Sequence, residues 1–359
     1  MKKSSHWFLG GLVFTATLGV VLSAVAFWWA AWQFQKPGPV KEPMLIEIPS
    51  GSGLRAIAAQ LETGGVINNE FIFIFGTTIL GAQSDMKAGE YEILPAASAS
   101  DIMQMIRDGR IYGRRITVRE GLTSFEIINL VNKLDDLEGT VSNTPPEGSL
   151  LPETYDYRLK ENKQDVVTRM QDGMTKAIEE LWPTRAQNLP FSTKEEAVIL
   201  ASIIEKETGV PSERKRVAGV FVNRLKKGIA LQTDPTVIYA LTNGKPKNEG
   251  KGPLGRRLLK KDLEFDSPYN TYLHPGLPPG PIANPGRASI EAALQPEEHN
   301  FIYFVADGKG GHIFSETLAE HEKNVAEWRV IRREKEKQAK EKAKEETKKE
   351  EAAEPAAGE

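Results

Sequence analysis

An uncharged apolar run near the N-terminus is the strongest pattern along the chain. No residue from Trp7 to Trp32 is charged, and a helix of this length spans about 39 Å at 1.5 Å per residue. The hydrocarbon core of a bilayer measures roughly 30 Å. Aromatic residues gather at both ends of the run, where the two membrane interfaces would lie. The pattern therefore predicts a single transmembrane anchor over residues 7–32.

The orientation of this anchor follows from the charges beside it. Lys2 and Lys3 precede the run, and positively charged residues favour the cytoplasmic side of a membrane. We therefore expect residues 1–6 in the cytoplasm and the remaining chain on the other side. The alternative is a cleaved signal peptide that ends at the small residues Ala24 to Ala26, but the apolar run continues past that site.

Shorter alternating and helical patterns follow the anchor and predict two small units. Residues 33–44 are rich in proline and predict a linker. Residues 45–95 have the order strand, helix, helix, strand, and residues 96–145 predict a second small α/β unit that ends in a linker. The predicted strands cover residues 45–48, 89–94 and 115–118, and the predicted helices cover residues 54–61, 70–80, 99–107 and 124–134.

The pattern beyond these units predicts a larger, mixed but mainly helical domain over residues 146–330. Helical spacing predicts helices over 166–181, 195–208 and 212–227, and alternation predicts a strand over 301–306. Together with the small units, this mixture defines an α+β fold. Residues 331–359 are rich in Lys, Glu and Ala and almost free of apolar residues. We expect them to form a charged, disordered tail.

One acidic residue lies on the apolar face of the helix predicted over 195–208. Glu207 follows Ile203 by four residues and Ile204 by three, so the three share one face. Glu205 points about 200° away, at 100° per residue, toward a smaller face that we expect to be wetter. Burial disfavours a charged carboxylate and raises its pKa. Glu207 is therefore a candidate general acid, and a solvated or ion-paired carboxylate is the alternative.

Five stretches of sequence carry a resemblance to a known family. The chain contains, in this order between Leu151 and Trp328, the stretches LASIIEKET, VFVNRL, LQTDPTVIYAL, YNTY followed by GLPPGPIANPG, and YFVADGKGGHIF. They resemble the endolytic murein transglycosylase family of bacteria, the MltG or YceG-like proteins. The catalytic glutamate of that family is the second acid of an ExE sequence, and the resemblance assigns this position to Glu207.

The resemblance implies an activity and its mechanism. Such an enzyme cleaves the β-1,4 bond between N-acetylmuramic acid (MurNAc) and N-acetylglucosamine (GlcNAc) in nascent glycan strands of peptidoglycan, and so terminates glycan elongation. One glutamate protonates the leaving oxygen and then accepts the proton of the C6 hydroxyl, which closes a 1,6-anhydro ring on MurNAc. The alternatives are a membrane-anchored peptidoglycan-binding scaffold without catalysis and a hydrolytic muramidase, which would use two carboxyl groups.

The resemblance also implies partners and a location. We expect a single-pass protein of the bacterial inner membrane, with its catalytic domain on the periplasmic or extracytoplasmic side. Peptidoglycan synthases are expected partners by analogy with the family. The unit over 45–95 resembles a LysM-like module, which is associated with glycan binding, and a spacer that positions the active site is the alternative.

Other polar residues are candidates for supporting or substrate-binding roles. Hydroxyl, amide and tyrosine side chains suit sugar hydroxyl and acetamido groups, and a purely structural role is the alternative for each of them. Asp234 precedes a proline, so a turn or helix cap is its alternative. We expect Arg224 to pair with Glu205 or Asp234. The candidates are Glu153, Glu205, Asn223, Gln232, Thr233, Asp234, Tyr239, Tyr269, Asn270 and Tyr272.

Composition narrows the chemistry further. The formal net charge of -3 over 359 residues gives no sign of nucleic-acid binding. The absence of cysteine excludes disulfides, thiolate metal sites and a cysteine nucleophile. His274, His312 and His321 lack the tight spacing of metal ligands, so we expect neither a metal nor a cofactor. The stretch Gly308 to His312 lacks the spacing of a phosphate-binding loop and predicts a hairpin turn.

Overall fold

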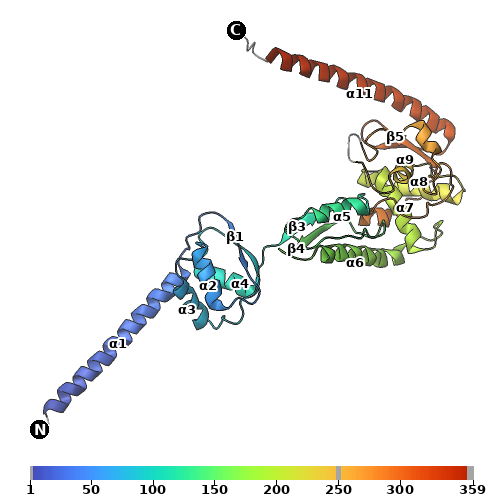
Figure 1. The fold of residues 1–359 in the computed structure, drawn as a ribbon. Coiled ribbons are helices and arrows are strands. Elements are labelled where there is room, and N and C mark those ends of the chain that lie inside the picture. Colours follow the sequence, from blue (N-terminus) through green and yellow to red (C-terminus); the bar gives the residue numbers. More distant parts are fainter. Residues whose placement is uncertain (1–2, 248–251, 354–359) are drawn as a thin grey trace. The chain divides into compact units, whose positions relative to one another are not determined.

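The computed structural model describes residues 3–247 and 252–353 and divides the chain into two compact units (Figure 1). Unit 1 comprises Met1–Arg115 and Asp156–Glu161, and unit 2 comprises Ile116–Tyr155 and Asn162–Glu359. Three parts of the sequence-based predictions lie outside the described part: the start of the cytoplasmic N-terminus (1–2), the side chains of 3–11, and the end of the charged tail (354–359).

Unit 1 has the predicted strand, helix, helix, strand order and adds one helix at each end. Its elements are α1 (Lys3–Gln35), β1 (Met44–Ile48), α2 (Leu54–Thr63), α3 (Glu70–Ile79), β2 (Gly89–Ile93) and α4 (Ala99–Asp108). β1 and β2 are antiparallel, with Ile46 opposite Tyr91. Ile102 and Ile106 of α4 lie in the same core as Tyr91. The sequence placed α4 in a separate unit beginning at residue 96, but this shared core places it in unit 1.

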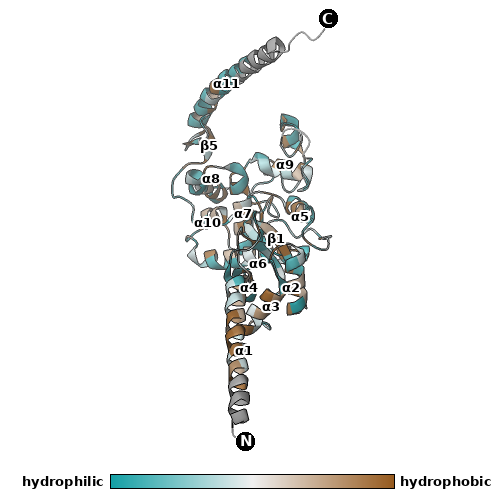
Figure 2. Ribbon diagram, turned by 90° about the vertical axis from the view of Figure 1, so that its left-hand side faces the viewer, coloured by the Kyte–Doolittle hydropathy of each residue, from teal (hydrophilic) through white to brown (hydrophobic). Residues whose placement is uncertain are grey.

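The apolar run forms one long helix. Within its described side chains, α1 is uncharged, its residues from Leu12 to Trp29 are exposed, and the helix is long and apolar enough to cross a membrane (Figure 2). The helix ends at Gln35, so it extends into the region predicted as a linker. Phe34 is only 4% exposed and packs against Phe73 of α3, with ring centroids 6.5 Å apart. The last turn of α1 is therefore part of the core of unit 1.

Unit 2 is built around helix α7 (Lys194–Glu207). Thr193 and Glu196 form a capping box that starts this helix. Its middle is buried throughout, and it packs against α8 (Arg214–Lys226) and α10 (Arg287–Leu294). The helix ends at Glu207 because Thr208 adopts an extended conformation and a Gly-Val-Pro sequence follows.

The other elements of unit 2 surround this central helix. They are α5 (Ser124–Asn132), α6 (Lys163–Leu181), α9 (Asp234–Thr242), β5 (Tyr303–Ala306), β6 (His312–Ser315) and α11 (Leu318–Ala353), with short 3-10 turns at η1 (Trp182–Thr184), η2 (Pro211–Glu213) and η3 (Lys260–Glu264). β3 (Arg114–Thr117) pairs with β4 (Thr154–Tyr157), and each has residues in both units.

The C-terminal part differs most from the sequence-based prediction. β5 and β6 form the expected antiparallel hairpin, with Tyr303 opposite Ser315. Helix α11 then packs against this hairpin and continues to Ala353, through most of the segment that we expected to be disordered. Lys, Glu and Ala are strong helix formers, and opposite charges four residues apart, such as Lys337 and Glu341 at 4.0 Å, support an exposed helix.

Candidate active site

Glu207 lines a pocket of about 470 Å³ at the C-terminal end of α7. The size is within the range of pockets that hold small ligands. Its walls come from the end of α7, from α8, from the segment that leads into α9, from the loop residue Tyr272, from strand β5 and from the first turns of α11. The lining residues are Glu207, Phe221, Arg224, Leu231, Gln232, Thr233, Asp234, Tyr272, Tyr303, Phe304, Val305, Leu318, His321, Val325 and Trp328.

The surroundings of Glu207 hold its carboxyl group near the midpoint of titration at neutral pH. The pKa of Glu207 is raised to about 7, mainly by burial and also by the negative charge of Asp234. Two contacts act in the opposite direction: the Thr233 hydroxyl donates a hydrogen bond to Oε1 of Glu207, and the charge of His312 lowers the pKa. The group can therefore be present as an acid and as a base at the same pH.

Thr233 is held in place by a small network of threonines. It is 2% exposed and precedes α9 as its N-cap residue. Its N–H group donates to Oγ1 of Thr271 at 3.2 Å, and its carbonyl accepts from Oγ1 of Thr236 at 2.7 Å. The hydroxyls of Thr236 and Thr271 lie 2.9 Å apart. These bonds fix the backbone of Thr233 and so aim its hydroxyl at Glu207.

The rim of the pocket carries further polar groups. Gln232 is exposed and has a left-handed backbone, with φ of 53°. Its Oε1 atom accepts a hydrogen bond of 2.8 Å from Nη2 of Arg224. Tyr272 donates its hydroxyl to Oδ1 of Asp234 at 2.7 Å. The rim therefore presents an amide, a carboxylate and a phenol, all suited to binding sugar hydroxyls.

Arg224 does not form the ion pair that the sequence predicted. Its guanidinium group donates to the carbonyl oxygens of Ala230 at 3.0 Å and Ile302 at 3.2 Å, in addition to Gln232. The prediction of Glu205 or Asp234 as its partner was therefore wrong. Arg224 instead ties the chain before α9 to the start of β5, and so fixes two walls of the pocket relative to each other.

Glu205 occupies a closed site rather than the wetter face that we expected. Its side chain is 6% exposed, Oε2 accepts a hydrogen bond of 2.9 Å from the N–H of Gly286, and Oε1 lies 3.7 Å from Nη2 of Arg214. The reason is tertiary: the Pro- and Gly-rich tract that ends at Gly286 covers this side of α7. Glu205 is not among the residues that line the pocket of Glu207.

The structure brings only some of the predicted candidates together. Gln232, Thr233, Asp234 and Tyr272 share the pocket with Glu207. Asn223 donates to the carbonyl oxygens of His299 and Phe301, and buried Asn270 donates to those of Leu263 and Phe265, so both amides support loops. Glu153 is exposed beside β4, and Tyr239 and Tyr269 pack on each other with ring centroids 4.8 Å apart, outside this pocket.

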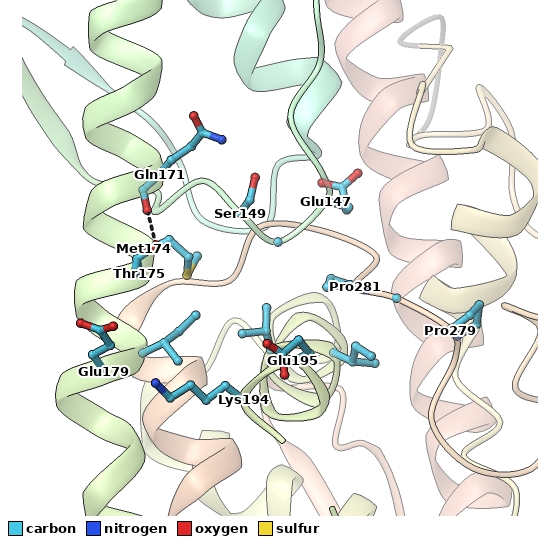
Figure 3. Close-up of a pocket in the computed structure, with 15 residues that line it drawn as sticks. Glu147, Ser149, Gln171, Met174, Thr175, Glu179, Lys194, Glu195, Pro279 and Pro281 are labelled. Carbon is cyan, nitrogen blue, oxygen red and sulfur yellow. Dashed lines mark hydrogen bonds between the residues drawn. The ribbon is translucent and has the colours of Figure 1, made fainter. Parts of the chain in front are cut away.

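A second pocket of about 520 Å³ lies beside the other end of α7 (Figure 3). Helix α6 supplies Gln171, Thr175 and Glu179 to it, and α7 supplies Lys194 and Glu195. Glu147 also lines this pocket and accepts hydrogen bonds from the N–H of Ser124 at 2.7 Å and from Nδ2 of Asn284 at 3.0 Å. Burial raises the pKa of Glu147 to about 7. No pattern in the sequence singles out this second carboxyl group.

The wall formed by α11 was also missed, although the sequence carries a signal for it. Leu318, His321, Val325 and Trp328 follow one another at intervals of three, four and three residues, which is the spacing of one helical face.

Within residues 3–247 and 252–353, no group of three or more His, Cys, Asp or Glu residues is arranged to hold a metal ion.

A half-buried carboxyl group with a pKa near 7, in a pocket with hydroxyl, amide and aromatic walls, defines the class of the protein. It is the arrangement of an enzyme that uses one acidic residue for general acid and base catalysis. The chain belongs to the YceG-like family, whose sequence profile matches residues 46–327. This match confirms the resemblance seen in the sequence.

The chain is also similar to individual proteins. The chain is 36% identical to a protein of Bacillus subtilis (strain 168) named endolytic murein transglycosylase, over 79% of this chain and 84% of the relative. A Streptococcus pneumoniae (strain D39) protein of the same name is 27% identical, over 80% of this chain and 58% of the relative. A crystal structure of a yceG-like protein from Listeria monocytogenes is 34% identical and covers 79% of this chain and 98% of that one, with a TM-score of 0.47.

Proposed function

We propose that this protein is an endolytic murein transglycosylase that cleaves the MurNAc-GlcNAc β-1,4 bond of nascent glycan strands and leaves 1,6-anhydro-MurNAc ends. Internal cleavage of this kind would terminate elongation. The name of the Bacillus subtilis relative supports the activity. The observation that carries the proposal is Glu207, with its pKa of about 7 and its hydrogen bond from Thr233. Binding without catalysis would have no use for such a residue.

The chemistry uses the carboxyl group of Glu207 twice. Protonated Glu207 donates its proton to the glycosidic oxygen while the bond from C1 of MurNAc to this oxygen breaks, and GlcNAc leaves with the new hydroxyl group. The Glu207 carboxylate then accepts the proton of the C6 hydroxyl of the same MurNAc, whose oxygen forms a bond to C1. Glu207 ends protonated, as it began, and no water is consumed. A pKa near 7 suits both steps, because neither protonation state is strongly favoured.

The neighbours of Glu207 support this cycle. The Thr233 hydroxyl stabilises the carboxylate that exists between the two steps. Asp234 lies close enough to raise the pKa of Glu207, and its negative charge would favour the positive charge that develops at C1 as the bond breaks. Gln232 and Tyr272 line the same pocket, and we expect their side chains to bind sugar hydroxyls.

The experiment compares two variants of helix α7 in the full-length chain. Glu207→Gln should lower the release of anhydro-ended fragments from purified sacculi by about 10² to 10⁴. Glu195→Gln is the same substitution on an exposed residue of the same helix, and it should retain activity. Reducing ends among the products would identify a hydrolytic muramidase. Absence of any new fragment from the unaltered chain would identify a scaffold, and near-normal release by Glu207→Gln would refute the role of Glu207.

We also propose that α1 anchors the protein in the bacterial inner membrane as a single span, with residues 1–6 in the cytoplasm and unit 2 outside. The length and apolar character of α1 support the span, and the lysines before it support the orientation. Alkaline phosphatase fused to the C-terminus should be active in cells. An inactive fusion of normal abundance would contradict this topology.

Two finer proposals concern unit 1 and the partners of the enzyme. The strand, helix, helix, strand order over residues 44–93 supports a LysM-like module that binds glycan. Replacing its exposed polar residues should weaken the retention of Glu207→Gln protein on sacculi, whereas a spacer would show no change. Association with peptidoglycan synthases rests on family resemblance, and co-purification after crosslinking in cells tests it.

A further inference from the structure

Helix α11 supplies a continuous strip of side chains to the pocket of Glu207. Leu318, His321, Val325 and Trp328 all line this pocket, and their spacing places them on one face over three turns of helix. The strip extends beyond the sequence profile of the family, which ends at residue 327. Trp328 is thus a pocket residue that the family match does not include.

The strip is fixed to the hairpin β5–β6 by several contacts. Nδ2 of Asn324 donates to Oγ of Ser315 at 2.9 Å. The rings of His321 and Tyr303 stack with centroids 5.0 Å apart and an angle of 18°. A Cβ atom on Gly308, in the hairpin turn, would lie 2.7 Å from Cγ2 of Ile331, so the helix approaches the turn closely. These contacts make α11 a fixed wall of the pocket.

The surface of this wall suits a sugar ring. Trp328 is half-buried, and the guanidinium carbon of Arg332 lies 5.3 Å from its ring centroid, which holds the ring in place. A flat aromatic surface packs against the apolar C–H face of a pyranose, while polar groups bind its hydroxyls. The same pocket has those polar groups in Gln232 and Asp234.

His321 adds an observation that points to a ligand. Its Nδ1 atom is buried and has no hydrogen-bond partner among the described residues. A buried polar atom without a hydrogen-bond partner is unfavourable, and a ligand group that bonds to this nitrogen would satisfy it. Burial and the nearby charge of Arg224 lower the pKa of His321, so its ring is neutral at pH 7 and has both a donor and an acceptor nitrogen.

We propose that Trp328 is a sugar-stacking residue of the active site, and that it binds a pyranose ring of the glycan next to the bond that Glu207 cleaves, with His321 positioning the aromatic wall. This inference rests on the proposed function. It assigns a specificity role to the start of α11, a helix that continues into a sequence rich in Lys and Glu. The ligand class is a β-1,4-linked glycan of N-acetylated hexoses.

The test measures affinity separately from turnover. The probe is an uncross-linked hexasaccharide of alternating GlcNAc and MurNAc, titrated calorimetrically into the full-length Glu207→Gln chain in detergent. Trp328→Leu keeps an apolar side chain but removes the flat ring, and it should weaken binding about five- to tenfold, as expected for one aromatic contact. Trp328→Tyr restores a ring and should recover most of the affinity. Val330→Ala, an exposed position of the same helix, should bind normally.

Several results would overturn this inference. Unchanged affinity in Trp328→Leu, or an equal loss in Trp328→Leu and Trp328→Tyr, would show that the ring does not stack on the glycan. An equal loss accompanied by a lower melting temperature in both variants would identify a structural role alone. If the Glu207→Gln chain consumes the probe, the proposed role of Glu207 fails. The inference about Trp328 is then decided separately, by comparing the KM of Trp328→Leu with that of Trp328→Tyr in chains with Glu207 intact.

Discussion

Removal of the Thr233 hydroxyl should shift the pKa of Glu207 upward by a measurable amount. A hydrogen bond to a charged group contributes about 1.5–3 kcal/mol, and one pKa unit corresponds to about 1.4 kcal/mol. Because the Thr233 hydroxyl bonds to the carboxylate form, Thr233→Val should raise the pKa of Glu207 from about 7 by about 1–2 units. The backbone bonds of residue 233 to Thr271 and Thr236 remain, so the fold should survive.

The pH dependence of kcat/KM measures this shift. The first step needs protonated Glu207, so activity should fall as the pH rises through its pKa, and in Thr233→Val this alkaline limb should move upward by 1–2 units. The assay quantifies anhydro-ended products from uncross-linked glycan strands between pH 5 and 10. Thr175→Val, an exposed threonine of α6 whose hydroxyl bonds to the carbonyl of Gln171, is the matched control. An alkaline limb that stays in place or moves downward in Thr233→Val would refute the reasoning.

Three further predictions concern stability and Glu205, the first acid of the ExE sequence. Glu205→Gln should lower the melting temperature because its buried ion pair is lost, but it should reduce activity less than tenfold. A loss as large as that of Glu207→Gln at an unchanged melting temperature would contradict this role. Gly219→Ala should destabilise unit 2 by about 1–3 kcal/mol, measured by urea denaturation, because its Cβ would lie 2.4 Å from the carbonyl oxygen of Glu297. Gly113→Ala, with open space at its Cβ, should be neutral, and equal stabilities would refute the argument. Glu147 binds its proton more tightly in the folded state, with a pKa of about 7 against 4.5, so it contributes stability below about pH 4.5 that is lost as the pH rises toward 7. Glu147→Gln should remove up to about 3 kcal/mol of this pH dependence, and melting curves of both proteins between pH 4 and 8 would show no difference if the reasoning is wrong.

The sequence predicted the features that depend on neighbouring residues along the chain. Helix α7 could be predicted because its apolar spacing and its capping sequence are local, and the same spacing placed Glu207 among buried side chains. The strand, helix, helix, strand order of unit 1 and the β5–β6 hairpin were likewise visible. The helical spacing from Leu318 to Trp328 is also present in the sequence, but the charged residues that follow it led us to expect disorder rather than a helix.

The remaining features depend on which distant segments meet. Glu205 is closed off by Gly286, about 80 residues further along the chain, and no periodicity of α7 contains that contact. Tyr239 follows Asp234 closely in the sequence, but it lies on α9 outside the pocket. Tyr272 is distant in the sequence, yet it lines the pocket and its hydroxyl donates to Asp234. Glu147 became recognisable only after folding, when Asn284 and Ser124 met it.

The packing of Phe34 has a mechanical consequence for unit 1. A Cβ atom on Gly76 would lie 2.5 Å from the Phe34 ring, so α1 and α3 are in close contact. Helix α1 is therefore joined to unit 1 rigidly and not through a flexible linker. A rotation or tilt of α1 must therefore turn unit 1 with it. Each residue inserted into the helix would rotate the domain by about 100° about the helix axis relative to the segment before the insertion, and would move it about 1.5 Å along that axis.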